Sequence, residues 1–329
     1  MAKRDPAADA ISRVAALKSI DDPNQLADAL RPLLAEKSNY IVARAAELAG
    51  ERGVRPLTPT LVELFEKLLA APTSKDAGCT AKTSIAKSLV QLEADRDAEA
   101  VAERGTRHAH WEASWGGSVD LAGGVRGHCA ILLAAMGSKK ALRCATELLA
   151  ERDLKMPRER NSVPVRCDAA RALTMIASDG AAAVLRFKAL EGDADPAVIS
   201  ECLAGVIAIE HEEGLSLAER YLDAVAGTRA DRDAEARAEA AMIAIGGSRL
   251  PSAFELLKKR SIDFLNSPSE STYLASIALT RQEPAIEYLL DLVRNGPRNQ
   301  SAAVVEALHP LHGVNNVAAR LKEACASRS

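Results

Sequence analysis

The chain has 329 residues, of which 48% are hydrophobic, 26% are charged and only 3% are aromatic. Its 42 basic and 45 acidic residues give a net charge of −3, so it lacks the basic excess with which proteins bind duplex nucleic acid. No stretch reaches the roughly 18 apolar residues of a membrane span, and the opening residues, MAKRDPAADA, contain no apolar signal segment. We therefore expect a cytoplasmic protein whose partner is neither nucleic acid nor a membrane.

Pairs of amphipathic helices are predicted over the first third of the chain, because apolar residues recur there at helical spacing. Pro23 suits the start of one of them, since a first-turn residue needs no N–H donor. The helix that closes the third pair is short. The expected helices lie near 7–19, 24–36, 39–53, 57–70, from 76 onward, and from 98 to about 104.

An irregular linker, 105–124, interrupts this pattern with the sequence GTRHAHWEASWGGSVDLAGG. It contains both tryptophans, Trp111 and Trp115, and glycines are concentrated at its end and just beyond. Glycine inside a helix costs about 1 kcal/mol relative to alanine. We therefore predict a loop or a strained helix start, with Ser118 or Asp120 as a candidate N-cap.

The segment 165–191 is the clearest repeat unit of the chain. Its first helix is expected to bury one face, Asp179-Gly180 is expected to end that helix, and a second helix should follow. The residues predicted to face inward are Val165, Ala169, Leu173 and Ile176, then Val184, Leu185, Phe187 and Leu190.

Related pairs surround this unit. VRGHCAILL (125–133) matches VRCDAARAL (165–173), and a second irregular linker with two prolines occupies 152–164. Further pairs follow from residue 197 to the C-terminus. A single pair cannot bury its apolar face alone, so neighbouring pairs must stack. We expect mostly helix, no sheet, and an elongated, curved shape.

The chain resembles the HEAT-repeat (armadillo-like) family of α-solenoids, and in particular short bacterial HEAT repeats. The likeness is carried by VRCDAARAL, VRGHCAILL, ARAEAAMIA and YIVARAAELAG. It implies an all-α, right-handed solenoid of about nine helical pairs that forms a single domain over residues 1–329. It also implies that a protein partner binds a concave face lined by the second helix of each pair.

The six cysteines contain no CxxC pair and fall in predicted helices, so we interpret them as small core residues in a reducing compartment. A zinc site from His108, His110, His128 and Cys129 is a weaker alternative. We favour solvated loop histidines, a capping His128 and a core Cys129. We expect no metal and no cofactor.

Other chemistries have less support. The single His211-Glu212 dyad falls short of the several dyads of iron-dependent HEAT hydroxylases, and no motif indicates a bilin partner. A group of HEAT-like DNA glycosylases uses tryptophan, arginine and aspartate around a flipped nucleotide. Similar residue types occur here without a matching motif, at Trp111, Trp115, Asp120, Arg126 and Arg143.

The two irregular linkers form the one candidate site. Both connect consecutive repeats on the same edge of a solenoid, so we expect them to be neighbours. Aromatic rings beside cations suit an acidic peptide, a phosphate or an exposed base. In the alternative interpretation, the tryptophans only fill a gap between repeats. The candidate binding residues are Trp111, Trp115, Arg126, His128, Arg158 and Arg160.

The sequence thus favours a non-catalytic, protein-binding scaffold that takes a protein or peptide partner. The alternative is an enzyme or receptor for a ligand or nucleic acid, of the DNA-glycosylase type, with its site at the insertion 105–128. The arginines of the repeated Val-Arg pairs, Arg126 and Arg166, are expected to bridge to acidic or carbonyl groups of a neighbouring repeat.

Overall fold

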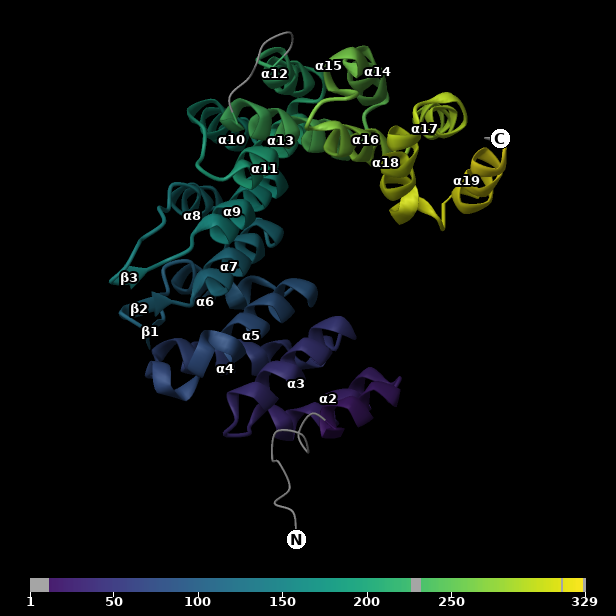
Figure 1. Ribbon diagram of the computed structural model, residues 1–329. Coiled ribbons are helices and arrows are strands. Elements are labelled where there is room, and N and C mark those ends of the chain that lie inside the picture. Colours follow the sequence, from purple (N-terminus) through teal and green to yellow (C-terminus); the bar gives the residue numbers. More distant parts are fainter. Residues whose placement is uncertain (1–11, 226–231, 315, 328–329) are drawn as a thin grey trace. The chain divides into compact units, whose positions relative to one another are not determined.

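The computed structural model describes residues 12–225, 232–314 and 316–327 (Figure 1). These residues divide into two compact units, Met1–Ala177 and Ser178–Ser329, and each is described here by itself. Within each unit the fold is an all-α, solenoid-like array of helices. Among the described residues, none of the helices has the length and low polarity needed to cross a bilayer.

The first unit is built from helical pairs whose first helices stack in a row. Helix α3 packs on α5, α5 on α7, and α7 on α9. The second helices α4, α6 and α8 each pack on the first helix of the next pair. The bounds are α2 Pro23–Leu34, α3 Asn39–Glu51, α4 Thr58–Ala70, α5 Thr80–Gln91, α6 Glu99–Gly105, α7 Gly123–Ala135, α8 Ala141–Leu149 and α9 Val163–Ile176.

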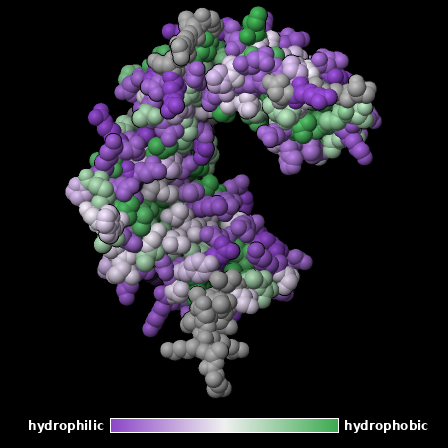
Figure 2. Space-filling view, in the orientation of Figure 1, coloured by the Kyte–Doolittle hydropathy of each residue, from purple (hydrophilic) through white to green (hydrophobic). Residues whose placement is uncertain are grey.

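The second unit repeats this arrangement. Helix α11 packs on α13, α13 on α16, and α16 on α18. The bounds are α10 Asp179–Glu191, α11 Pro196–Glu210, α12 Glu212–Asp223, α13 Arg232–Ser248, α14 Pro251–Lys259, α15 Ser261–Phe264, α16 Glu270–Leu279, α17 Glu283–Asn295, α18 Arg298–Leu308 and α19 Val317–Ala326. Hydrophilic residues dominate the face of the molecule in Figure 2.

The predicted succession of helices is confirmed over the described residues, although the helix expected near 7–19 lies partly outside them. Residues 12–16 are helical there. The two units are described separately, so their arrangement relative to each other does not test the predicted overall shape. The single, right-handed, curved solenoid over 1–329 therefore stays a prediction.

The expectation of no sheet was wrong. A small three-stranded sheet with the order β1-β2-β3 forms from β1 Trp111–Ser114, β2 Gly117–Asp120 and β3 Arg158–Glu159. Strands β1 and β2 make an antiparallel hairpin, and β3, from the second linker, pairs with β2 in parallel. The two linkers are therefore neighbours, as predicted, and they become partners in a sheet because each supplies backbone hydrogen-bond groups to the other.

Glycines allow this pairing. Gly116, in the turn between β1 and β2, has a φ of +86°, a conformation that favours glycine. A Cβ on Gly117 would lie 1.9 Å from the carbonyl oxygen of Pro157, so any side chain there would block the second linker. The backbone N–H of Ser118 donates to that same oxygen at 2.8 Å.

The glycines at the start of α7 are not in a loop, in contrast to one of our predictions. Helix α7 begins at Gly123, and Ala122, not Ser118 or Asp120, is its N-cap residue. A Cβ on Gly127 would lie 2.2 Å from a carboxylate oxygen of Asp168 in α9. The glycines of α7 are thus explained by the close approach of a neighbouring helix, although their low helix propensity alone predicts a loop.

The repeat unit 165–191 is partly as predicted. Val165, Ala169 and Leu173 are fully buried. The break falls at Ala177, which has a φ of +50°, and the hydroxyl of Ser178 accepts from the N–H of Ala181 to begin α10.

The inward face predicted for α10 was only partly right, because Phe187 and Leu190 are 67% and 53% exposed. Alanines at 181, 182 and 189 fill the buried face with Leu185 instead. A helix face made of alanine gives a weak apolar signal, so the larger side chains dominated the prediction.

The prediction that the six cysteines are core residues is confirmed for five of them, which are buried. Cys325 is exposed.

Leu173→Ala should lower the free energy of unfolding by about 2–5 kcal/mol, because it removes a fully buried side chain and leaves a cavity. Chemical denaturation followed by circular dichroism measures the change. Met175→Ala, on the same helix but 49% exposed, is the matched control and should stay within about 0.5 kcal/mol. Equal losses in the two variants would contradict the assignment of the buried face.

Candidate functional site

One buried carboxylate joins the two linkers. Asp120 ends β2, and its side chain is fully buried. Its Oδ1 accepts from the backbone N–H groups of His110 (3.0 Å) and Ala122 (3.1 Å). Its Oδ2 accepts from Arg126 Nη1 (2.9 Å) and Arg160 Nε (2.8 Å). The hairpin, the start of α7 and the second linker therefore meet at one side chain.

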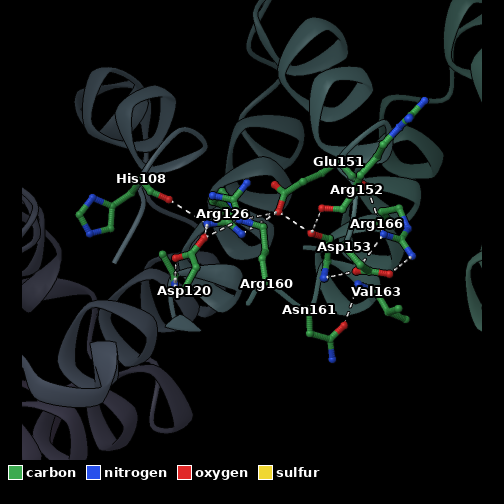
Figure 3. A network of polar contacts seen from close by, with 12 residues as sticks. His108, Asp120, Arg126, Glu151, Arg152, Asp153, Arg160, Asn161, Val163 and Arg166 are labelled. Carbon is green, nitrogen blue, oxygen red and sulfur yellow. Dashed lines mark hydrogen bonds and ion pairs between the residues drawn. The ribbon is translucent and has the colours of Figure 1, made fainter. Parts of the chain in front are cut away.

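Arg126 extends this polar network, as Figure 3 shows. The side chain is 4% exposed; its Nη1 also donates to the carbonyl of His108 at 2.9 Å, and its Nη2 donates to Glu151 Oε1 at 2.8 Å. The hydroxyl of Ser162 donates to the same Glu151 oxygen at 2.7 Å. Two arginines and two carboxylates balance in charge here, as burial of ionic groups requires.

The same pattern recurs one repeat later. Arg166 is 3% exposed and donates to the carbonyl of Glu151 at 3.0 Å and to Asp153 at 3.3 Å. The prediction that Arg126 and Arg166 bridge to acidic or carbonyl groups is confirmed, but these groups lie in or beside the two linkers and not within the helices of a neighbouring repeat. Arg126 and Arg160 are both candidate binding residues, but Arg126 donates through Nη1 and Nη2, and Arg160 through Nε, to acceptors inside the protein. These bonds hold the two linkers together.

The network determines how Asp120 titrates. Burial alone would raise its pKa, but hydrogen bonds from His110 and Ala122 and the charges of Arg126 and Arg160 outweigh burial. The pKa of Asp120 is therefore lowered from its usual 3.8. The carboxylate stays ionised at neutral pH, which keeps the two guanidinium groups paired.

The two tryptophans have different environments. Trp111 is half-buried, and the guanidinium carbons of Arg158 and Arg160 lie 4.2 and 5.3 Å from its ring centroid. Trp115, in the hairpin turn, is 98% exposed. Trp115 thus fills no gap between repeats, whereas Trp111 packs under the second linker.

The histidines differ from the expectation of a solvated pair and a helix cap. His128 lies inside α7, where its Nδ1 contacts the carbonyl of Gly124 at 2.6 Å. His110 is fully buried and His108 is half-buried. Burial, together with the charges of Lys82 and His110, lowers the pKa of His108 to about 4, so its imidazole is neutral at physiological pH.

Of the four residues weighed for zinc, the structure brings only two together. Cys129 is fully buried in the helical core, as predicted, and lies apart from a metal-ligand cluster. The cysteine near His108 and His110 is Cys79, from the preceding pair. Nothing in the spacing of these residues indicates this contact, because it depends on how α5 and the hairpin pack.

Comparison with known proteins identifies neither a family nor a function for this chain. No family model matches the chain, and no curated protein sequence matches it. The complex of CpcE and CpcF of phycocyanin lyase from a Nostoc species is similar over 88% of this chain and 94% of that one, with 15% identity and a TM-score of 0.46. Human deoxyhypusine hydroxylase in complex with glycerol is similar over 85% and 100%, with 12% identity and a TM-score of 0.30. Likeness at this level carries no argument about function, and the similarity to HEAT repeats stays a resemblance.

Asp120→Asn should lower the free energy of unfolding by about 3–5 kcal/mol at neutral pH, because it removes one of the two carboxylates that balance Arg126 and Arg160. Asp28→Asn removes an exposed partner of Arg31 and should cost less than about 1 kcal/mol. Urea denaturation measures both, and a small loss for Asp120→Asn would contradict the role given to this carboxylate.

The pH dependence of the Asp120 contribution has a definite sign. The native pKa is below the unfolded value, so the contribution is complete well above pH 3.8 and is lost as pH falls through the native pKa. The difference in stability between wild type and Asp120→Asn should therefore shrink as denaturation is repeated from about pH 7 down to about pH 3. A difference that grows over this range would show that the sign is wrong.

Proposed function

We propose that the protein is a non-catalytic scaffold that binds a partner protein through the surface of its two linkers. This surface, the linker face, consists of Trp111, Trp115, Leu154, Met156, Arg158 and the neighbouring cations Arg152 and Lys155. The observation that carries the proposal is the 98% exposure of Trp115. Tryptophan is usually well buried in folded proteins, and it is enriched among the residues that dominate protein interfaces.

Other apolar groups extend the linker face beyond Trp115. Leu154 and Met156 are 41% and 44% exposed. The Met156 methyl lies 3.1 Å from the position of a Cβ on Gly116, which places it beside the hairpin turn. Methionine and tryptophan together adapt to an apolar side chain of a partner.

The charge of the linker face favours an acidic partner. Arg152, Lys155 and Arg158 are exposed, whereas Asp153 of the same linker pairs with Arg166. Arg158 also stacks on Trp111, which presents its guanidinium in a fixed position. We therefore propose as partner an acidic segment that carries an apolar side chain.

The sheet and the Asp120 network make this surface rigid before binding. A preorganised surface loses less conformational entropy on association, so more of the contact energy appears as affinity. The enzyme alternative has less support, because Asp120 and Arg126 pair with each other in the core while Trp115 projects into solvent. The buried free cysteines support a reducing, cytoplasmic setting.

The double variant Trp115→Ala/Arg158→Ala should bind the partner at least about 30-fold more weakly, since removing an interface hot spot costs about 2 kcal/mol or more. Its melting temperature should be nearly unchanged, because both side chains are exposed. A displayed peptide library selected on the wild-type chain supplies ligands, and isothermal titration gives their affinities.

Phe187→Ala is the matched control, since it removes another exposed aromatic side chain in the second unit. It should leave affinity unchanged. Selected peptides should be rich in Asp and Glu next to an apolar residue, and their binding should weaken with salt. Peptides without acidic enrichment, or with equal affinity for the double variant, would place the binding surface elsewhere.

A further inference from the structure

A separate cluster of metal-ligand residues lies at the base of the hairpin. The Sγ of Cys79 and one ring nitrogen each of His108 and His110 all lie within 4.8 Å of one another. Cys79 and His110 are fully buried, and His108 is half-buried. Figure 3 shows the imidazole of His108 pointing away from the Asp120 network, so that network does not account for it.

One ring nitrogen of His110 is buried and has no hydrogen-bond partner among the described residues. The other, Nε2, lies 2.8 Å from Glu112 Oε1, and an ionised carboxylate only accepts, so Nε2 carries the proton. In the neutral imidazole, Nδ1 then carries a lone pair that can accept a proton or bind a metal. A carboxylate that holds one nitrogen of a histidine while the other is free is the usual arrangement around a metal-binding histidine.

His108 provides a second such nitrogen. Its Nε2 is also buried without a hydrogen-bond partner in the part of the chain that the structure describes. Buried polar atoms are nearly always paired, and an unpaired one is costly. Two unpaired imidazole nitrogens beside one thiol point to a ligand that accepts electron pairs from all three.

The backbone around Cys79 is held in an unfavourable conformation. Gly78 and Cys79 have φ values of +73° and +54°, and the second is costly for a residue with a side chain. The N–H of Gly78 donates to Glu112 Oε1 at 2.6 Å. Glu112 therefore fixes both the turn that carries Cys79 and the ring of His110.

Asp76 fixes the same turn from the other side. Its buried carboxylate accepts from the N–H groups of Ala81 and Lys82 at the start of α5. It also pairs with the buried Lys82 ammonium at 3.2 Å. The amide of Asn39 donates to Asp76 Oδ1 at 3.2 Å and to the carbonyl of Ala77 at 2.8 Å.

We propose that Cys79, His108 and His110 bind a zinc ion through one thiolate and two imidazole nitrogens, with Glu112 as the positioning residue of His110. Nitrogen and sulfur are the ligands that zinc prefers, and three protein ligands leave a fourth position for water or a partner's side chain. Bonds of about 2.0–2.3 Å require the ligand atoms, which lie within 4.8 Å of one another, to move inward by less than about 1 Å. The ion, the thiolate and Glu112 sum to zero charge, and Lys82 is balanced by Asp76, so burial leaves no net charge.

A nucleophilic role for Cys79 has less support. The side chain is fully buried, whereas a reactive cysteine needs partial exposure. An ion has a way in, because His108 also borders a surface pocket of about 430 Å³ between α4 and α6. That pocket is lined by Glu66, Leu69, Ala70, Arg104, Arg107, His108 and Ala109.

A bound ion would join the start of α5 to the base of the hairpin. This inference is independent of the proposed scaffold function, because its residues lie outside the linker face. It differs from the sequence-based expectation of no metal. That expectation weighed a different ligand set, with Cys129 in place of Cys79. It took His108 and His110 to be solvated, whereas His110 is fully buried and His108 is half-buried.

Cobalt titration of the full chain, stripped of metal by a chelator, tests the site. Adventitious binding is reduced by using Cys325→Ser/His309→Ala as the starting protein, since Cys325 is exposed and His309 lies beside His312. We expect one Co²⁺ per chain, a thiolate-to-cobalt charge-transfer band, and displacement by Zn²⁺. X-ray absorption of the zinc-loaded starting protein should show one sulfur and two imidazole nitrogens around the ion. This measurement does not depend on the folding of any further variant.

Variants then assign the ligands. Cys79→Ser should abolish the charge-transfer band, while Cys144→Ser, which alters another buried thiol, should retain it. Glu112→Gln should weaken cobalt binding by about 10–100-fold with the band unchanged in shape, as expected for a residue that only orients a ligand. A zinc shell without sulfur, a band that survives in Cys79→Ser, or no cobalt bound by the starting protein would overturn the proposal.

Discussion

The buried ion pair between Asp120 and Arg126 is the interaction on which the irregular part of this protein depends. A lone carboxylate in the core costs several kcal/mol, and a lone guanidinium costs as much. Asp120 avoids that cost by accepting from two backbone N–H groups and two arginines at once. The four donors come from the hairpin, the start of α7 and the second linker. Two segments that interrupt a helical array are thereby locked to each other and to the array.

This locking holds the hairpin in a defined position that a mobile loop would not have. A tryptophan in a flexible linker would collapse onto nearby apolar surface or sample many positions. Trp115 instead stands in a turn whose strands pair in a defined register, from Trp111 opposite Asp120 to Ser114 opposite Gly117. Its exposure is therefore a property of the fold, and the same rigidity supports a role in recognition.

Strand β1, together with the residue just before it, makes different contacts on its two faces. Side chains alternate along a strand, so Trp111 points toward Arg158 and Arg160, while His110 and Glu112 point toward the turn before α5. One short segment thus links the linker face on one side with the Cys79 cluster on the other. A zinc ion in that cluster would stiffen the base of the hairpin from below, as the Asp120 network does beside it.

The sequence alone determined the helical pairs, the inward face around Leu173 and the nearness of the two linkers. Each depends on local periodicity or on the order of repeats, which can be recognised residue by residue. The sheet required a parallel pairing between Ser118 and Arg158, and glycines at 117 and 127 that admit another segment were indistinguishable from loop glycines. Only the tertiary structure decided that Cys79 meets His108 and His110, that Arg126 is buried while Trp115 is exposed, and that alanines rather than Phe187 fill the core side of α10. These outcomes depend on contacts between residues far apart in the chain, and such contacts leave no periodic signal in the sequence.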